Sequence, residues 1–149
     1  MKIRVQTEAF DLGAEVDAIR RERTDIGAIA SFVGLARDMN EGSGVAAMTL
    51  EHYPGMTEKA LAAIVDEAGQ RWPLQDVTVI HRVGRLLPGD PIVLVVVAGA
   101  HRGEAFAACE FLMDYLKTRA PFWKKEETPQ GDRWVEARAS DDAAAERWD

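Results

Sequence analysis

The most constraining feature of this sequence is an uninterrupted run of apolar residues from Ile92 to Ala98, most of them β-branched. The run is far too short to cross a bilayer, which takes about 20 residues as a helix. β-Branched side chains favour strands, and a strand without polar alternation is typical of the centre of a sheet. We therefore predict a central strand over 91–98.

Other elements follow from the spacing of apolar residues and from turn signals. Alternating or apolar segments predict strands at 2–8, 25–34, 45–53, 77–83, 122–127 and 133–137. Helical spacing predicts helices at about 11–23, from 56 onward, at 102–119 and at 141–148. The segment 38–44 is predicted as a loop, and Leu87–Asp90 as a type II turn. This order indicates an α+β protein or an α/β sandwich with helices packed on a mixed sheet.

Composition limits the class of protein. The chain has 149 residues, which fits one domain over 1–149. Its net charge of −7 disfavours nucleic acid as a partner, because phosphate contacts need a basic face. The single cysteine, Cys109, excludes an internal disulfide, and the first residues show no apolar signal core. We expect a cytoplasmic protein with no membrane segment.

Basic residues are concentrated near one proline. Three of the five lysines, Lys117, Lys124 and Lys125, fall within nine residues, and no acidic residue lies between the first and the last. The plain interpretation is a favourable charge at a helix end and two solvated strand lysines. The sharper one is that the bend at Pro121 brings two ammonium groups into one cavity, where they would serve proton transfer. The sequence leaves both open.

A second cationic group lies where the central strand is followed by a helix. The first turn of a helix presents unpaired N–H groups, so His101 and Arg102 there could hold a phosphate. Arg37, at the end of another apolar strand, could add a third positive group. Alternatively, these are ordinary polar residues at element ends.

Metal and cysteine chemistry are not expected. The three histidines lie in separate elements without Cys or Glu at ligand spacing, which predicts no metal site. Cys109 lies on the apolar stripe of its helix and is interpreted as a core residue. Any sulfur used by this protein would have to be imported.

Several stretches together resemble the large subunit of molybdopterin synthases. They are Phe-Val-Gly-Leu-Ala-Arg (32–37), Leu-Glu-His-Tyr-Pro-Gly-Met-Thr-Glu (50–58), Ile-His-Arg-Val-Gly (80–84), Pro-Gly-Asp (88–90), His-Arg (101–102), Met-Asp-Tyr-Leu-Lys-Thr-Arg-Ala-Pro-Phe-Trp-Lys-Lys-Glu (113–126) and Gly-Asp-Arg-Trp-Val (131–135). The resemblance covers nearly the whole chain, and the long lysine-bearing block is highly specific.

The resemblance implies a fold and a reaction. The fold is α+β and α/β hammerhead-like, with helices on a mixed, largely antiparallel sheet and an additional small antiparallel sheet. Enzymes of this family convert cyclic pyranopterin monophosphate into the dithiolene of molybdopterin. Sulfur arrives as a thiocarboxylate at the Gly-Gly terminus of a small ubiquitin-like subunit, and two large subunits form the centre of a heterotetramer. No cofactor or metal is implied.

The resemblance also implies roles for individual residues. Lys117 and Lys124 match the essential lysines of the family. The remaining substrate contacts match Leu35, Ala36, Arg37, His101, Arg102, Lys125 and Glu126. A competing hypothesis is a non-catalytic module whose basic pocket binds an anion or an acidic peptide end, for which Lys117→Ala would weaken binding in proportion to any loss of activity.

Overall fold

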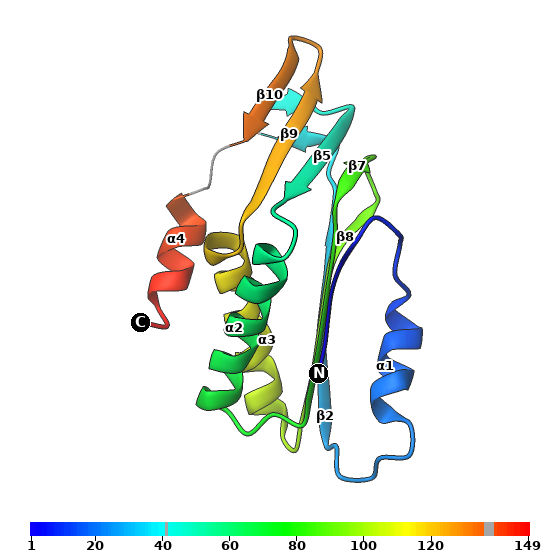
Figure 1. Ribbon diagram of the computed structural model, residues 1–149, viewed down its shortest axis with the longest axis vertical. Helices are drawn as coiled ribbons and strands as arrows, with labels where there is room; N and C mark the ends of the chain where they lie inside the picture. The colour runs from blue at the N-terminus through cyan, green and yellow to red at the C-terminus, as the bar shows by residue number, and fades with distance from the viewer. Residues whose placement is uncertain (41, 136–138) are drawn as a thin grey trace.

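The computed structural model describes residues 1–40, 42–135 and 139–149 (Figure 1). The strands are β1 (Lys2–Gln6), β2 (Ala28–Leu35), β3 (Met39–Asn40), β4 (Ser43–Gly44), β5 (Ala47–His52), β6 (Asp76–Arg82), β7 (Gly84–Leu86), β8 (Pro91–Gly99), β9 (Phe122–Thr128) and β10 (Gly131–Val135). The helices are α1 (Leu12–Arg20), α2 (Met56–Arg71), α3 (Arg102–Arg119) and α4 (Ala139–Glu146). Within the described chain, no helix is long and apolar enough to span a membrane.

The main sheet has the strand order β1-β6-β8-β2 and confirms the predicted central strand. β1 runs parallel to β6, whereas β8 is antiparallel to both β6 and β2. Helices α2 and α3 cover one face of this sheet and α1 covers the other (Figure 1). The fold is therefore α+β with a mixed sheet, as predicted.

The two covered faces explain why β8 is apolar throughout. Val93, Val95 and Val97 point into the core beneath α2 and α3. The alternate residues Leu94, Val96 and Ala98 pack on the α1 side. Because a strand buried on both faces has no solvent side, it shows no polar alternation.

A second, antiparallel sheet has the order β10-β9-β5-β7 and projects beyond the first, at the end where α3 finishes (Figure 1). This is the additional antiparallel sheet that the family resemblance implied. Its strand β9 begins directly after Pro121, and it pairs with β5 from His52 opposite Phe122 to Ala47 opposite Glu127.

Some predicted boundaries were wrong, for local reasons. The 38–44 segment is not all loop, because Met39 pairs with Gly44 and Asn40 with Ser43 in a two-stranded sheet. The short strand β7 was missed. The β9–β10 turn is shorter than predicted, since Thr128 already pairs with Gly131. The predicted strand 133–137 ends beyond the described residues, which stop at Val135 before resuming at 139.

Candidate functional site

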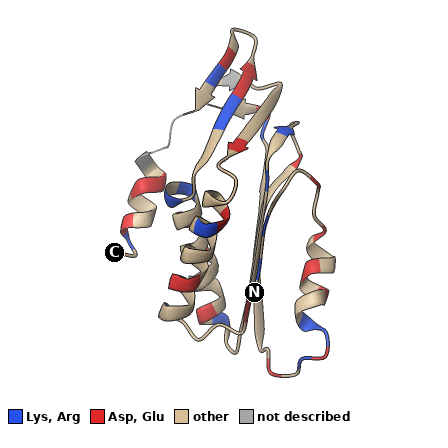
Figure 2. Cartoon of the chain, in the orientation of Figure 1, with Lys and Arg blue, Asp and Glu red and all other residues tan. Residues whose placement is uncertain are grey.

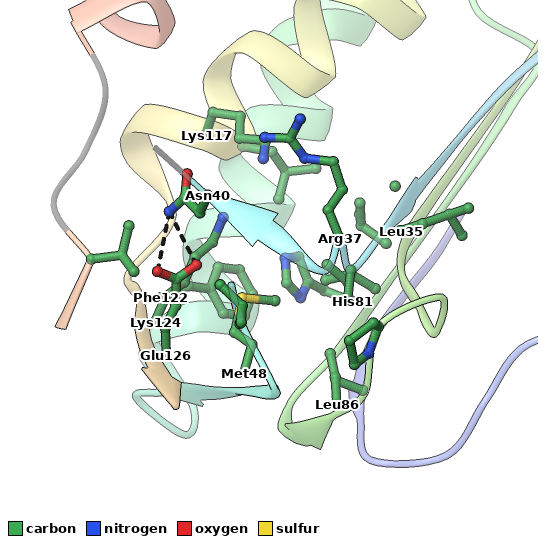
Figure 3. A pocket seen from close by; sticks show the side chains of 18 of the residues that line it. Leu35, Arg37, Asn40, Met48, His81, Leu86, Lys117, Phe122, Lys124 and Glu126 are labelled. Carbon is green, nitrogen blue, oxygen red and sulfur yellow. Dashed lines mark hydrogen bonds between the residues drawn. The ribbon is translucent and has the colours of Figure 1, made fainter. Parts of the chain in front are cut away.

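A cavity of about 470 Å³ lies where the last turn of α3, the strand β9 and the segment after β2 meet (Figure 3). Its wall includes three basic side chains from these three elements: Arg37, Lys117 and Lys124. Apolar side chains such as Met48, Leu86 and Phe122 line the remainder. In Figure 2, basic segments lie on β9, followed there by acidic ones, and at the end of α3.

The two lysines converge because the chain turns at Pro121. Lys117 lies in the last turn of α3, and Ala120 leaves the helix in an extended conformation. Since a residue before proline avoids the helical region, the helix ends there and β9 can begin. Strand residues alternate between faces, so Phe122, Lys124 and Glu126 all point to the cavity. The structure thus brings Lys117 and Lys124 to one cavity.

Lys125 lies on the opposite face of β9. Its ammonium is 5.8 Å from the centre of the Trp134 ring, on the neighbouring strand β10. It is not among the residues that line the cavity. Lys125 was expected among the substrate contacts. Within a single chain it is not one of them, because consecutive side chains of a strand point to opposite faces and Lys124 already points to the cavity.

The predicted turn at Leu87–Asp90 positions the cavity residues after β2. Gly89 has the positive φ of 92° that a type II turn requires at its third residue. The Ala36 N–H donates to the Asp90 carbonyl (2.9 Å), and the Gly89 N–H donates to the Ala36 carbonyl (2.7 Å). These two bonds fix the backbone of Ala36, so the side chains of Leu35 and Arg37 on either side of it reach the cavity.

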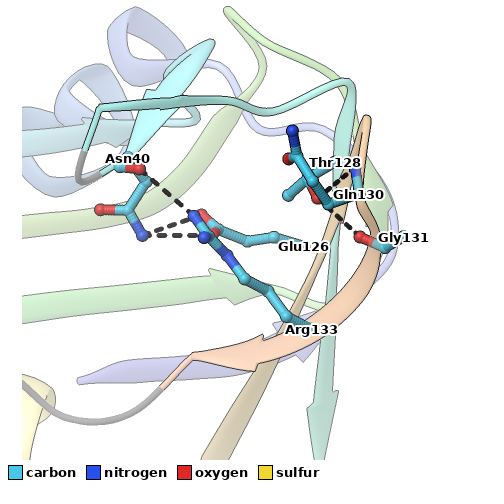
Figure 4. A network of polar contacts seen from close by, with 6 residues as sticks. All are labelled: Asn40, Glu126, Thr128, Gln130, Gly131 and Arg133. Atoms are coloured by element: carbon cyan, nitrogen blue, oxygen red, sulfur yellow. Dashed lines mark hydrogen bonds and ion pairs between the residues drawn. The ribbon is translucent and has the colours of Figure 1, made fainter.

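Glu126 is a buried polar residue with structural partners (Figure 4). It is 5% exposed, and its carboxylate accepts hydrogen bonds from Asn40 Nδ2 (3.0 Å) and Arg133 Nε (3.1 Å). Arg133 also donates to the Asn40 carbonyl (3.2 Å). Although Glu126 lines the cavity, its carboxylate joins β9, β10 and the β3 segment, a function that the sequence did not reveal.

His81 lines the same cavity and was not singled out from the sequence. It follows Val77 and Val79 on the face of β6 that packs beneath α3. The residue is 8% exposed, and its ring stacks on Phe122, with centroids 3.8 Å apart and planes 18° from parallel. The signal available in the sequence was a titratable side chain at a position where strand alternation predicts another apolar, inward-facing residue.

Burial lowers the pKa of His81, as do the positive charges of Lys124 and Lys117 and the nearby His52, and together they bring it from 6.5 to about 4. The carbonyl of Arg82, which accepts from Nδ1 at 2.8 Å, opposes the shift. The imidazole is therefore neutral at physiological pH.

This shift predicts a pH-dependent stability. Between pH 6.5 and about 4 the unfolded chain binds a proton at His81 that the folded chain does not, so the free energy of unfolding falls as the pH is lowered through this window. Urea unfolding at pH 7, 5.5 and 4.5 should show that His81→Phe lacks this part of the acid destabilisation. The exposed His101→Phe variant should retain it; an unchanged pH dependence in His81→Phe would contradict the prediction.

His101 and Arg102 lie far from the cavity within one chain. They begin α3, an 18-residue helix whose other end carries Lys117. At 1.5 Å per residue the fifteen-residue separation from Arg102 to Lys117 is roughly 22 Å. Both His101 and Arg102 are exposed. The expectation that they join Arg37 in one phosphate site is therefore not met by a single copy of the chain.

Cys109 is buried on the inner side of α3, as predicted. Burial raises the pKa of its thiol to about 11, which keeps it protonated at neutral pH. A thiol in this state is a poor nucleophile. Across the described residues, no group of three or more His, Cys, Asp or Glu side chains is placed to hold a metal ion.

The cavity is thus chemically suited to an anionic ligand with a flat or apolar body. Three cations attract negative charge, and the apolar side chains beside the half-buried Lys124 lower the local dielectric, which strengthens its effect. A neutral imidazole provides a hydrogen-bond acceptor in the same space. These are groups for binding an anion and for moving protons.

Comparisons with known proteins agree on one family. The family model described as MoaE protein matches residues 5–119. A molybdopterin synthase catalytic subunit from Ralstonia nicotianae is 68% identical over 98% of this chain and 83% of its own length. The structure of a molybdopterin biosynthesis MoaE protein from Burkholderia ambifaria is 64% identical, with a TM-score of 0.85, and the match covers 99% of this chain and 97% of that one. A chain from the complex of subunits 1 and 2 of molybdopterin-converting factor from Helicobacter pylori is 20% identical and shares the fold, with a TM-score of 0.74 over 91% of each chain.

Proposed function

The chain belongs to the MoaE protein family, and from this premise we propose that it is the catalytic subunit of a molybdopterin synthase, acting in the cytoplasm. It transfers sulfur to cyclic pyranopterin monophosphate and so forms the dithiolene of molybdopterin. The observation that carries this proposal is the cavity in which Lys117, Lys124 and Arg37 converge.

The sulfur donor is the thiocarboxylated Gly-Gly terminus of a small ubiquitin-like subunit. An imported sulfur is needed because the one cysteine of the chain is buried and protonated. A thiocarboxylate is an anion, and Lys117, at the open end of α3, is placed to orient it and to take part in proton transfer. Lys124, deeper on β9, holds the pterin intermediate or supplies a proton as the partner's carboxylate leaves.

The phosphate of the substrate needs cations as well. Arg37 provides one at the cavity. His101 and Arg102 contribute if a second copy of the chain places the start of its α3 beside this cavity, which is the arrangement we propose for the homodimer within the heterotetramer. Exposed apolar residues on the edge strand β2, Phe32 and Leu35, support such a pairing of two chains.

Reconstitution tests the proposed function directly. The purified protein, mixed with a thiocarboxylated small subunit and cyclic pyranopterin monophosphate, should yield a dithiolene-bearing pterin, detected by fluorescence of its oxidised form after chromatography. The matched control replaces the thiocarboxylate by the ordinary carboxylate and should give none. Absence of product with a donor whose thiocarboxylate has been verified by mass spectrometry would refute the proposal.

A further inference from the structure

The cavity contains a proton acceptor for which the proposed function has no task. We propose that His81 is a general base of the sulfur transfer, taking a proton from the water that releases the donor's acyl group. This inference rests on the proposed function and adds a catalytic residue to it. Its starting point is the placement of the imidazole at the cavity wall among the basic side chains (Figure 3).

The hydrogen bond of His81 fixes which nitrogen is basic. Nδ1 lies 2.8 Å from the carbonyl oxygen of Arg82. Since a carbonyl oxygen only accepts, Nδ1 carries the hydrogen and Nε2 keeps its lone pair. Stacking on Phe122 at 3.8 Å holds the plane of the ring, so the direction of that lone pair is fixed as well.

Burial is the main reason that the ring stays neutral, and the charges around it add to this effect. Lys117 on α3, Lys124 on β9 and His52 on β5 all disfavour the imidazolium, while the cross-strand neighbours Val5 and Val93 are apolar. An anionic thiocarboxylate bound at the lysines offsets their charge and so raises the pKa of His81, while the larger lowering caused by burial remains. The base therefore becomes stronger when the donor is present.

The other ionisable acceptors among the described residues of the cavity wall are Glu126 and Asp141. Glu126 is held by Asn40 and Arg133, as described above. Asp141 lies on α4, which belongs to a different wall from His81. Asp141 is therefore the alternative candidate for the general base, and its substitution serves as a control.

The step itself is a hydrolysis. The thiocarboxylate sulfur adds to a carbonyl carbon of the pterin, and the electron pair of that C=O π bond moves to its oxygen, which takes a proton from solvent. The sulfur is then bonded to both the pterin and the donor's acyl carbon, as a thioester. Nε2 of His81 takes one proton from water while the water oxygen bonds to the acyl carbon. The carbon–sulfur bond then breaks, its electron pair stays on sulfur, and the pterin keeps a thiolate. The acid so formed loses its proton to give the donor's carboxylate, His81 returns its proton to solvent, and nothing is oxidised or reduced.

Single-turnover reactions with substituted proteins test this role. His81→Phe keeps the stacking surface but lacks Nε2, so dithiolene formation should fall on the order of 10²-fold. The small subunit joined to the pterin through the thioester should accumulate, and intact-mass spectrometry measures it. His81→Gln and His81→Asn carry an amide oxygen, which accepts a hydrogen bond but does not take a proton from water, so neither variant should restore the activity lost in His81→Phe.

Several outcomes separate the possibilities. Normal turnover in His81→Phe, or lost turnover without the adduct, overturns the role of His81 while leaving the proposed function intact. Adduct accumulation in Asp141→Asn but not in the His81 variants assigns the role to Asp141 instead. If wild-type protein forms no dithiolene, the proposed function fails and this inference with it. Should His81→Phe not fold, ¹⁵N spectra of the wild-type histidine decide, because a proton on Nε2 at pH 7 contradicts the proposal.

Discussion

Lys124→Ala should reduce dithiolene formation about 10³-fold while leaving the affinity for the small subunit nearly unchanged. The side chain lies on the cavity face of β9, so its ammonium acts on groups bound in the cavity and not on the outer surface. Truncation removes a cation from a partly desolvated site, where a charge has its largest effect on a transition state. Turnover and binding are measured separately, by product formation and by titration calorimetry.

Its neighbour Lys125 provides a matched control. Lys125→Ala removes the same charge one residue away, but from the face that carries Trp134, so activity should stay within about threefold of wild type. Similar losses in both variants would show that overall charge, and not the position of the ammonium, determines activity. A loss of affinity that parallels the loss of turnover in Lys124→Ala would favour the non-catalytic binding module instead.

Glu126→Ala should lower the free energy of unfolding by about 3 kcal/mol, because it leaves a buried amide and a guanidinium without their shared carboxylate partner. Asn40 is 9% exposed, and its side chain donates to both carboxylate oxygens at 3.0 and 3.2 Å. Arg133 forms its ion pair with the same group at 3.1 Å. The loss should also loosen the β3 segment, which follows Arg37, and so reduce activity.

The adjacent residue again supplies the control. Glu127 points to the other face of β9 and pairs with the exposed Arg85 at 2.9 Å. A surface pair of this kind contributes about 0–1 kcal/mol, so Glu127→Ala should be nearly neutral in urea unfolding. Equal destabilisation by the two substitutions would contradict the role given to Glu126. Glu126→Gln, which keeps the shape and one acceptor, should fall between wild type and Glu126→Ala.

Local periodicity explains which parts of the fold were predictable. The run through β8 identified the central strand, because burial on both faces leaves a signature in consecutive residues. Pro121 marked the end of α3 through its own sterics. The two short strands β3 and β4 left no such signature. They depend on pairing with each other and on the contact of Asn40 with Glu126, 86 residues away.

The candidate site was likewise predictable only in part. The sequence by itself determined the family, the cation-rich block and the strand that carries Lys124 and Lys125, but it assigned both lysines to one site. Only the tertiary structure decided that Lys117 and Lys124 share a cavity, that His81 lies against it, and that the start of α3 lies far from it. The chemistry of the side chains and the periodic spacing of apolar residues can be read from neighbouring residues. A cavity, by contrast, is formed by residues distant in sequence and depends on how whole elements pack.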